Sequence, residues 1–185
     1  LRVDANGVLG RREWASWCDG LNALGPAASA VEYFEQPLPP ATGDAGWREQ
    51  VRLAAIATIP VALDEGLADW SAPRRVRAAH WPGPLVVKPS LLSDAEEFAK
   101  WRNRTKADLI YSSVFETSVG LYAALCLAAS DPHLGRRALG FGTLDAFAAD
   151  GLQLPAHKPG PSLALRALTA DDFLDAWQRL AYGTT

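Results

Sequence analysis

Four ionisable residues, each at the end of a short apolar run, offer the clearest chemistry in this sequence. They are Asp4, Glu35, Asp64 and Lys88. Glu35 lies 31 positions after Asp4, Asp64 lies 29 after Glu35, and Lys88 lies 24 after Asp64. A strand, a loop, a helix and a return loop take about 25 to 35 residues, so this spacing is typical of repeated βα units.

The three acids and the lysine would meet at one edge of such a fold, because parallel barrel strands place their carboxyl ends on the same face. Asp4, Glu35 and Asp64 are oxygen donors with no His or Cys among them, and such donors suit Mg²⁺, or Mn²⁺, better than Zn²⁺. A divalent ion there would stabilise the negative charge that develops when a proton leaves next to a carboxylate. Lys88 could act as acid, base or cationic stabiliser.

A single acid at a strand end has a simpler interpretation, as a helix N-cap or a loop hydrogen-bond acceptor. Glu65, which follows Asp64 directly, is expected to support Asp64 rather than to bind the metal itself. Three successive strands that end in an acid, followed by one that ends in lysine, are harder to explain in this way. We therefore interpret the four residues as a site.

The elements that would position these residues alternate along the chain. Ser93 is expected to cap one helix, with Glu96 completing a capping box. An alanine-rich helix ends near Ser130. We expect the helix that Ser93 caps at 94–105, and further helices at 11–24, 46–57, 72–79 and 171–180. Strands are expected at 1–4, 31–34, 60–63, 84–88, 108–112, 138–141 and, less regularly, 163–168.

The fold class predicted from this order is α/β, as a partial TIM-type (β/α) barrel over residues 1–145. A complete barrel takes about 250 residues, whereas this chain has 185, has no methionine and opens directly on a strand. We therefore expect the C-terminal portion of a longer protein. Residues 146–185 are expected to form a tail that packs against the barrel and against a region that this chain lacks.

Composition excludes several classes of function. The chain is 49% hydrophobic with 21% charged residues and a net charge of −3, and its 18 Lys and Arg are scattered, which gives no indication of nucleic-acid binding. No apolar run reaches the roughly 18 residues that a membrane span needs, and the N-terminus has no signal-peptide pattern. We expect a cytoplasmic protein with a small-molecule partner.

The motifs at the strand ends, taken as an ordered set, resemble the enolase superfamily in its muconate-lactonizing-enzyme subgroup. They are Asp-Ala-Asn from Asp4, Glu-Gln-Pro from Glu35, Asp-Glu from Asp64 and Lys-Pro-Ser from Lys88, which match the ends of the third to sixth barrel strands. The segment 111–121, Tyr-Ser-Ser-Val-Phe-Glu-Thr-Ser-Val-Gly-Leu, is similar to the seventh-strand segment of the o-succinylbenzoate synthase family. The resemblance covers about residues 1–145 and implies that the chain spans roughly the third to eighth strands.

The resemblance also implies roles for individual residues. Asp4, Glu35 and Asp64 would be the Mg²⁺ ligands, with Glu35 chosen because it precedes Gln-Pro, and Lys88 would stabilise an enolate as a cation. The family's general base is a lysine of a Lys-x-Lys motif on the second strand, which this chain does not contain. The missing N-terminal region, with the first strands and the capping domain, is expected to complete the site. Substrate would be held by Asn6, Ser112, Ser113, Glu116, Thr117 and Ser118.

The reaction that the resemblance implies is a syn-elimination of water, a carbon–oxygen lyase reaction. It converts 2-succinyl-6-hydroxy-2,4-cyclohexadiene-1-carboxylate into o-succinylbenzoate in menaquinone or phylloquinone biosynthesis, and we expect the fragment alone to be inactive. Two alternatives stay open. The first is an N-succinylamino acid racemase or dipeptide epimerase with the same metal. The second is a non-catalytic, metal-binding remnant of a barrel.

Overall fold

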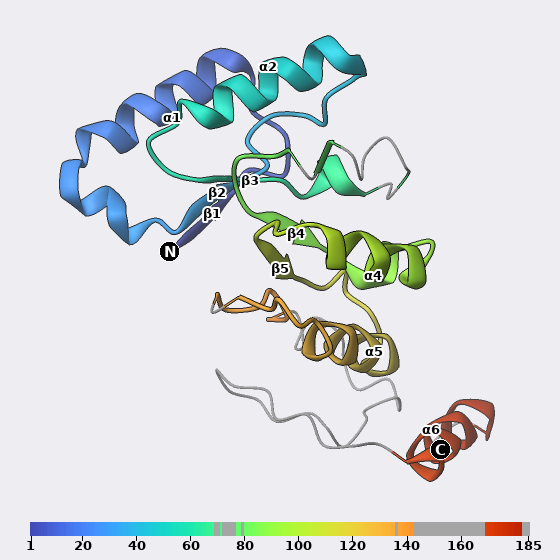
Figure 1. The fold of residues 1–185 in the computed structure, drawn as a ribbon. Coiled ribbons are helices and arrows are strands. Elements are labelled where there is room, and N and C mark those ends of the chain that lie inside the picture. The colour runs from blue at the N-terminus through green and yellow to red at the C-terminus, as the bar shows by residue number, and fades with distance from the viewer. Residues whose placement is uncertain (69–70, 72–76, 79, 136, 143–168, 183–185) are drawn as a thin grey trace. The chain divides into compact units, whose positions relative to one another are not determined.

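A computed structural model describes residues 1–68, 71, 77–78, 80–135, 137–142 and 169–182 (Figure 1). The chain divides into two compact units. The first unit comprises Leu1–Val87 with Leu91–Ile110, and the second comprises Lys88–Ser90 with Tyr111–Thr185. The predicted division at residue 145 lies outside the described residues, as do the predicted strand at 163–168 and most of the predicted helix at 72–79.

Short parallel strands form the centre of the first unit. β1 (Arg2–Asp4), β2 (Tyr33–Glu35) and β3 (Val61–Ala62) form a parallel sheet in that order. A parallel β-bridge between Leu63, which follows β3, and Leu85 links this sheet to β4 (Leu85–Val87). β4 pairs with β5 (Leu109–Tyr111), whose last residue begins the second segment of the other unit. Neighbours in the sheet are consecutive in the chain, so the first five predicted strands are confirmed.

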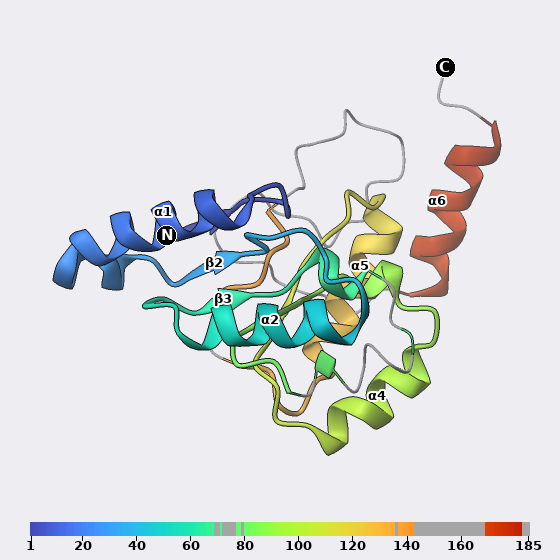
Figure 2. The same ribbon diagram turned by 90° about the horizontal axis from the view of Figure 1, so that it is seen from above.

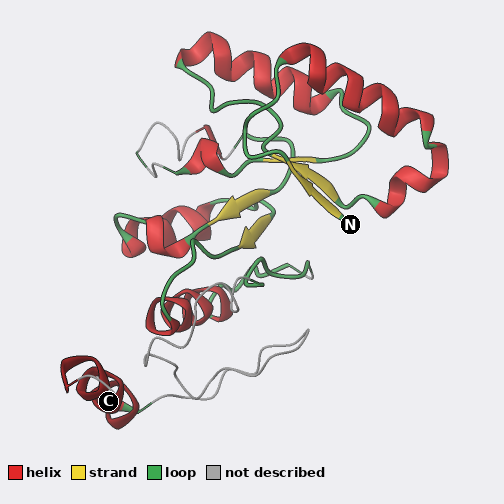
Figure 3. Cartoon of the chain, turned by 180° about the vertical axis from the view of Figure 1, so that it is seen from behind, coloured by secondary structure: helices red, strands yellow, loops and turns green. Residues whose placement is uncertain are grey.

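Two helices pack on one face of the three-stranded sheet (Figures 1 and 2). They are α1 (Arg11–Ala23) and α2 (Gly43–Ala55). Trp14 and Leu21 of α1, with Leu53 and Ala54 of α2, contact the same apolar cluster as Phe34. Figure 3, coloured by secondary structure, shows that helices alternate with short strands along the chain of this unit.

The observed ends of α1 and α2 show which of the sequence signals for helix ends are correct. α1 ends at Ala23, and Gly25 follows with φ +53°, the left-handed backbone that commonly terminates a helix. α2 begins at Gly43 rather than at residue 46, because Thr42 is the extended N-cap and Asp44 favours the positive end of the helix dipole. Short 3₁₀ turns at Gly25–Ala30, Glu65–Leu67 and Pro89–Leu91 were not predicted.

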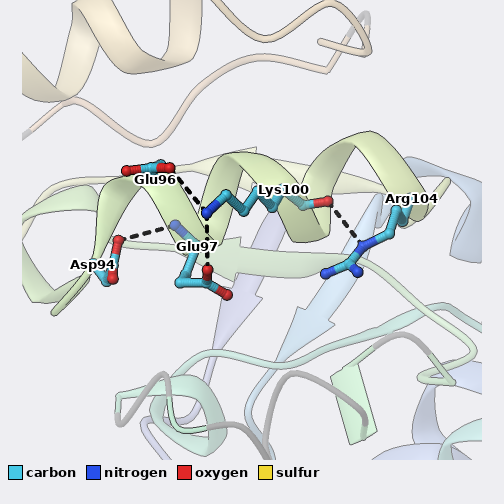
Figure 4. A network of polar contacts seen from close by, with 5 residues as sticks. All are labelled: Asp94, Glu96, Glu97, Lys100 and Arg104. Atoms are coloured by element: carbon cyan, nitrogen blue, oxygen red, sulfur yellow. Dashed lines mark hydrogen bonds and ion pairs between the residues drawn. The ribbon is translucent and has the colours of Figure 1, made fainter.

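The helix between β4 and β5, α4 (Ala95–Arg104), corrects the predicted capping residue. Asp94, not Ser93, is the N-cap, and its Oδ1 accepts the Glu97 N–H at 2.9 Å (Figure 4). Both residue types are good N-caps, so the sequence alone could not separate two adjacent candidates. The predicted helix is confirmed, but its capping box is wrong.

The second unit contains α5 (Ser118–Ala129) and α6 (Ala170–Tyr182). Of the strand predicted at 138–141, the structure shows one parallel bridge, between Ser112 and Gly140. The Ser112 hydroxyl also donates to the Gly140 carbonyl oxygen at 3.0 Å, so a side chain supplements the backbone pairing. None of the helices that the structure describes is long and apolar enough to cross a membrane.

Apolar residues of the first unit separate onto the two faces of its strands. Phe34 and Val61 face the helices. The opposite face carries a second buried cluster of Tyr33, Ala62, Val86 and Ile110. This alternation is the period of two that extended strands impose. It therefore defines an inner layer, made by those four residues.

Candidate active site

Two of the predicted acids follow the inner layer by two positions along their strands. Glu35 lies two residues after Tyr33, and Asp64 lies two residues after Ala62. Asp4 and Glu35 are register partners, as are Glu35 and Ala62. Register partners on parallel strands share a face, so the backbone places Asp4 and Glu35 side by side at the carboxyl ends of β1 and β2. Asp64 belongs to the next strand end along the sheet.

The loops that leave β1 and β2 run together. The Ala5 N–H donates to the Glu35 carbonyl oxygen at 3.2 Å, and the Gly7 N–H donates to that of Gln36 at 2.7 Å. Asn6 and Gly7 have φ values of +48° and +69°, the left-handed region that turns the chain sharply. The position of Asp4 is therefore fixed relative to β2 by the backbone.

The Asp4 carboxylate takes part in this turn. Its Oδ1 accepts the backbone N–H of Asn6 at 2.8 Å, which is an Asx-type local bond. Both residues are exposed. Asn6, predicted to bind substrate, is placed by this contact at the surface of the β1 exit loop.

The acids differ in burial. Asp64 is 5% exposed, Glu35 and Glu65 are half-buried, and Asp4 is exposed. Glu65 opens the 3₁₀ turn that follows Asp64, and its carbonyl oxygen accepts the Ala68 N–H.

The predicted convergence of the three carboxylates on a metal ion stays a prediction. Across the described ranges, no group of three or more His, Cys, Asp or Glu is placed to hold a metal ion. The strand ends of Asp4, Glu35 and Asp64 are neighbours, but the carboxylates are not gathered. Like charges disfavour close approach, and Asp4 is turned toward the Asn6 N–H. The donor set still fits Mg²⁺ in kind, because all three residues supply carboxylate oxygens.

Gln36 contacts the loop of Asp64, and the sequence alone predicted no role for it. Its side-chain Oε1 accepts the N–H groups of both Asp64 and Gly66 at 3.0 Å, and its Nε2 donates to the Leu38 carbonyl oxygen at 2.7 Å. The side chain is 2% exposed. It therefore links the exit of β2 to the loop that carries Asp64 and Glu65. A polar residue between a strand end and a proline is the one signal that could have indicated it.

Lys88 lies in the second unit, directly after β4, and is half-buried. It begins the short segment Lys88–Ser90, and Ser90 Oγ donates to Glu116 Oε1 at 2.8 Å. This bond connects the chain that follows Lys88 to the loop after β5.

Glu116 acts within its own loop. Its Oε2 accepts the Val114 N–H at 3.0 Å, and its Oε1 accepts the Ser90 hydroxyl. Burial alone would raise the pKa of Glu116, but hydrogen bonds from Ser113, Ser90 and backbone N–H groups outweigh it, and the pKa lies below its ordinary value. Glu116 was predicted to hold substrate. Its described contacts stabilise the loop as a carboxylate, and its role in holding substrate stays a prediction.

The other predicted substrate-binding residues lie in the same loop and helix start. Ser113 is 5% exposed, and its Oγ accepts the Phe115 N–H at 3.0 Å. Ser112 is half-buried against Gly140. Thr117 is the exposed N-cap of α5, and the Ser118 side chain lies outside the described part of the structure.

Lys100 illustrates why a lysine elsewhere in the chain does not supply the general base. It lies on α4 in ion pairs with Glu96 at 2.9 Å and Glu97 at 3.2 Å (Figure 4). Hydrogen bonds to Glu96 and then to Glu97 raise the pKa of Lys100 above its ordinary value. A protonated lysine in such a surface cluster is a poor general base.

The fold of this chain is similar to that of the enolase-superfamily (β/α) barrel enzymes. The chain superposes with a TM-score of 0.58 and 25% identity on the crystal structure of MenC from Desulfotalea psychrophila, covering 78% of this chain and 39% of that one. It also superposes, with a TM-score of 0.59, on the L-Ala-D/L-Glu epimerase from Bacillus subtilis, over 76% of this chain and 38% of that one. At 18% identity this second likeness shows the fold alone. The predicted partial barrel is confirmed in outline.

Sequence comparison narrows the class to particular relatives, the o-succinylbenzoate synthases. The chain is 31% identical over 171 residues to the synthase of Mycobacterium tuberculosis, covering 92% of this chain and 49% of that protein. It is also 31% identical over 147 residues to the synthase of Thermosynechococcus vestitus, covering 77% of this chain and 42% of that protein. No family model matches the chain. The predicted resemblance is thus confirmed, and the chain spans less than half the length of these relatives.

Proposed function

We propose that the protein carrying this chain is an o-succinylbenzoate synthase, which eliminates water from 2-succinyl-6-hydroxy-2,4-cyclohexadiene-1-carboxylate in menaquinone or phylloquinone biosynthesis. The observation that carries the proposal is the sequence similarity to synthases over 92% of the chain. The register of Asp4 and Glu35 at adjacent strand ends supports it, because this is where barrel enzymes hold their active sites.

Asp4, Glu35 and Asp64 would hold a Mg²⁺ ion, with Mn²⁺ as a substitute. A bound ion would supply electrostatic stabilisation of the negative charge that forms next to the substrate carboxylate. Asp64 is buried and its backbone is fixed by Gln36, so its carboxylate would lose little freedom on binding. Glu65, next to Asp64, would support that ligand.

Lys88 would place a positive charge close to the enolate-like oxygen, and thereby lower the barrier to proton removal. The Ser90–Glu116 hydrogen bond ties the segment behind Lys88 to the loop that would receive the succinyl group. In this proposal the succinyl group is held by hydroxyl groups of Ser112, Ser113, Thr117 and Ser118, together with Glu116 of the same loop. The Asn6 amide would hold the substrate carboxylate.

A substrate panel tests this function. The 185-residue chain, alone and joined to the N-terminal portion of the Mycobacterium tuberculosis relative, is given the cyclohexadiene, an N-succinylamino acid and a dipeptide. Dehydration by the joined protein, lost in Lys88→Ala, is the expected result. Racemisation or epimerisation without dehydration would replace the reaction and keep the barrel assignment. A folded protein inactive on all three would contradict the proposal and favour a non-catalytic barrel.

A further inference from the structure

We propose that Gln36 is a positioning residue, whose side-chain amide fixes the loop of Asp64 and Glu65 in the shape that binds the metal ion. The inference rests on the proposed function, because it takes Asp64 as a metal ligand. Its geometric part, the bracing of the loop, stands on hydrogen bonds that lie entirely within the first unit.

Both the oxygen and the nitrogen of the Gln36 side-chain amide form hydrogen bonds. Oε1 accepts two N–H groups, those of Asp64 and Gly66, each at 3.0 Å, and one amide oxygen has two lone pairs for this purpose. Nε2 donates to the Leu38 carbonyl oxygen at 2.7 Å. The Gln36 N–H itself donates to the Ala62 carbonyl oxygen at 2.9 Å. One residue therefore holds the end of β3 and the loop beyond it.

The loop needs this side chain because the strand ladder ends before it. β3 ends at Ala62, and Asp64 has φ −125° and ψ −82°, which is not strand geometry. Buried N–H groups require a partner, and Asp64 is 5% exposed. Without Gln36, the Asp64 N–H would lose the partner that this structure gives it.

The backbone of Gln36 gives independent support. Its φ is +34°, an uncommon conformation for a residue with a side chain, which persists where the surroundings determine it. A glycine would adopt this φ more easily but could not form the three side-chain bonds. The sequence thus keeps a strained position and a polar side chain together, at the residue after the proposed ligand Glu35.

Hydrogen exchange of the 185-residue chain tests the bracing. In Gln36→Leu, the Asp64 and Gly66 amides should exchange about tenfold faster, the factor that corresponds to about 1.4 kcal/mol in opening free energy. Gln50→Leu is the matched control, because Gln50 also donates its amide to a backbone oxygen, that of Pro39, but does not contact Asp64. Unchanged exchange in Gln36→Leu would overturn the bracing.

A second variant keeps the test decisive if Gln36→Leu does not fold. Gln36→Glu retains oxygen acceptors for Asp64 and Gly66 but loses the donor to Leu38. It should keep the protection of the two amides within about twofold of wild type. Loss of protection in Gln36→Glu would show that the acceptor does not hold the loop, and would overturn the inference.

Calorimetric titration with Mg²⁺ tests the consequence for the metal. Gln36→Leu should bind Mg²⁺ about tenfold more weakly than wild type, and Gln50→Leu should bind it equally well. Equal affinity in wild type and Gln36→Leu would overturn the positioning role while leaving the proposed function standing. No Mg²⁺ binding by the wild-type chain would instead count against the metal site itself, and the exchange pattern would still decide whether Gln36 braces the loop.

Discussion

Gly83→Ala should destabilise the first unit strongly, because the backbone leaves no room for a methyl group. A Cβ at Gly83 would lie 2.1 Å from the Val61 carbonyl oxygen, against a practical minimum of about 3.0 Å. That same oxygen accepts the Trp81 indole N–H at 2.9 Å. The substitution must therefore move the start of β3, the strand that leads to Asp64, by about 0.9 Å.

The magnitude follows from two costs. Forced overpacking of a well-packed position costs about 1–3 kcal/mol, and loss of one internal hydrogen bond costs about 0.5–1.5 kcal/mol. We expect the free energy of unfolding to fall by about 2–4 kcal/mol. At a typical urea dependence of about 2 kcal/mol per molar, the midpoint would fall by about 1–2 M.

Urea unfolding followed by circular dichroism measures this change, and two variants control it. Gly20→Ala changes an exposed glycine within α1 that has nothing within 4 Å of the added Cβ, so it should stabilise the chain by about 0.5–1 kcal/mol. Trp81→Phe deletes the indole donor and should cost about 1 kcal/mol. A Gly83→Ala midpoint within 0.2 M (about 0.4 kcal/mol) of wild type would refute the close approach of Gly83 to the Val61 carbonyl oxygen.

Two further predictions concern the cap and the loop. Asp94→Ala should lower the free energy of unfolding by about 1 kcal/mol and Ser93→Ala by much less, since Asp94 accepts the Glu97 N–H. If both variants lowered the free energy of urea unfolding equally, Asp94 would not be the dominant N-cap. The pKa of Glu116 is lowered in the folded state, so its contribution to stability is present above the unfolded value of about 4.5 and is lost as the pH falls through the folded value. In Glu116→Gln, the free energy of unfolding should fall less than in wild type between about pH 5 and pH 2. An unchanged dependence of this free energy on pH would show that the carboxylate does not stabilise the loop.

The strand ends were predictable because two local signals coincide there. Apolar runs such as Leu85–Val87 form buried strands, and an ionisable or turn-forming residue marks where burial stops. The α1 boundaries followed equally from the Trp14 and Leu21 spacing and from Gly25. These features are determined by residues within one helical turn or one strand, so the local sequence is enough to predict them.

Other features depend on contacts between distant segments, and the sequence could not show them. Gln36 reaches a loop 28 to 30 positions further along, and nothing near Gln36 specifies that loop's path. Glu116 accepts the hydroxyl of Ser90, which lies 26 positions earlier in the chain, and no local pattern indicates that contact. The 3₁₀ turn at Glu65–Leu67 likewise follows from how the chain leaves β3.

The most direct test of the central claim is the Mg²⁺ dependence of dehydration in a matched pair of variants. The chain, joined to the N-terminal portion of the Mycobacterium tuberculosis relative, is assayed for o-succinylbenzoate formation by absorbance. Asp64→Asn removes the buried strand-end carboxylate, and Asp19→Asn removes the same charge from an exposed position on α1. We predict Mg²⁺-dependent conversion that survives in Asp19→Asn and is lost in Asp64→Asn. Conversion that persists in Asp64→Asn, or that does not need Mg²⁺, would contradict the account.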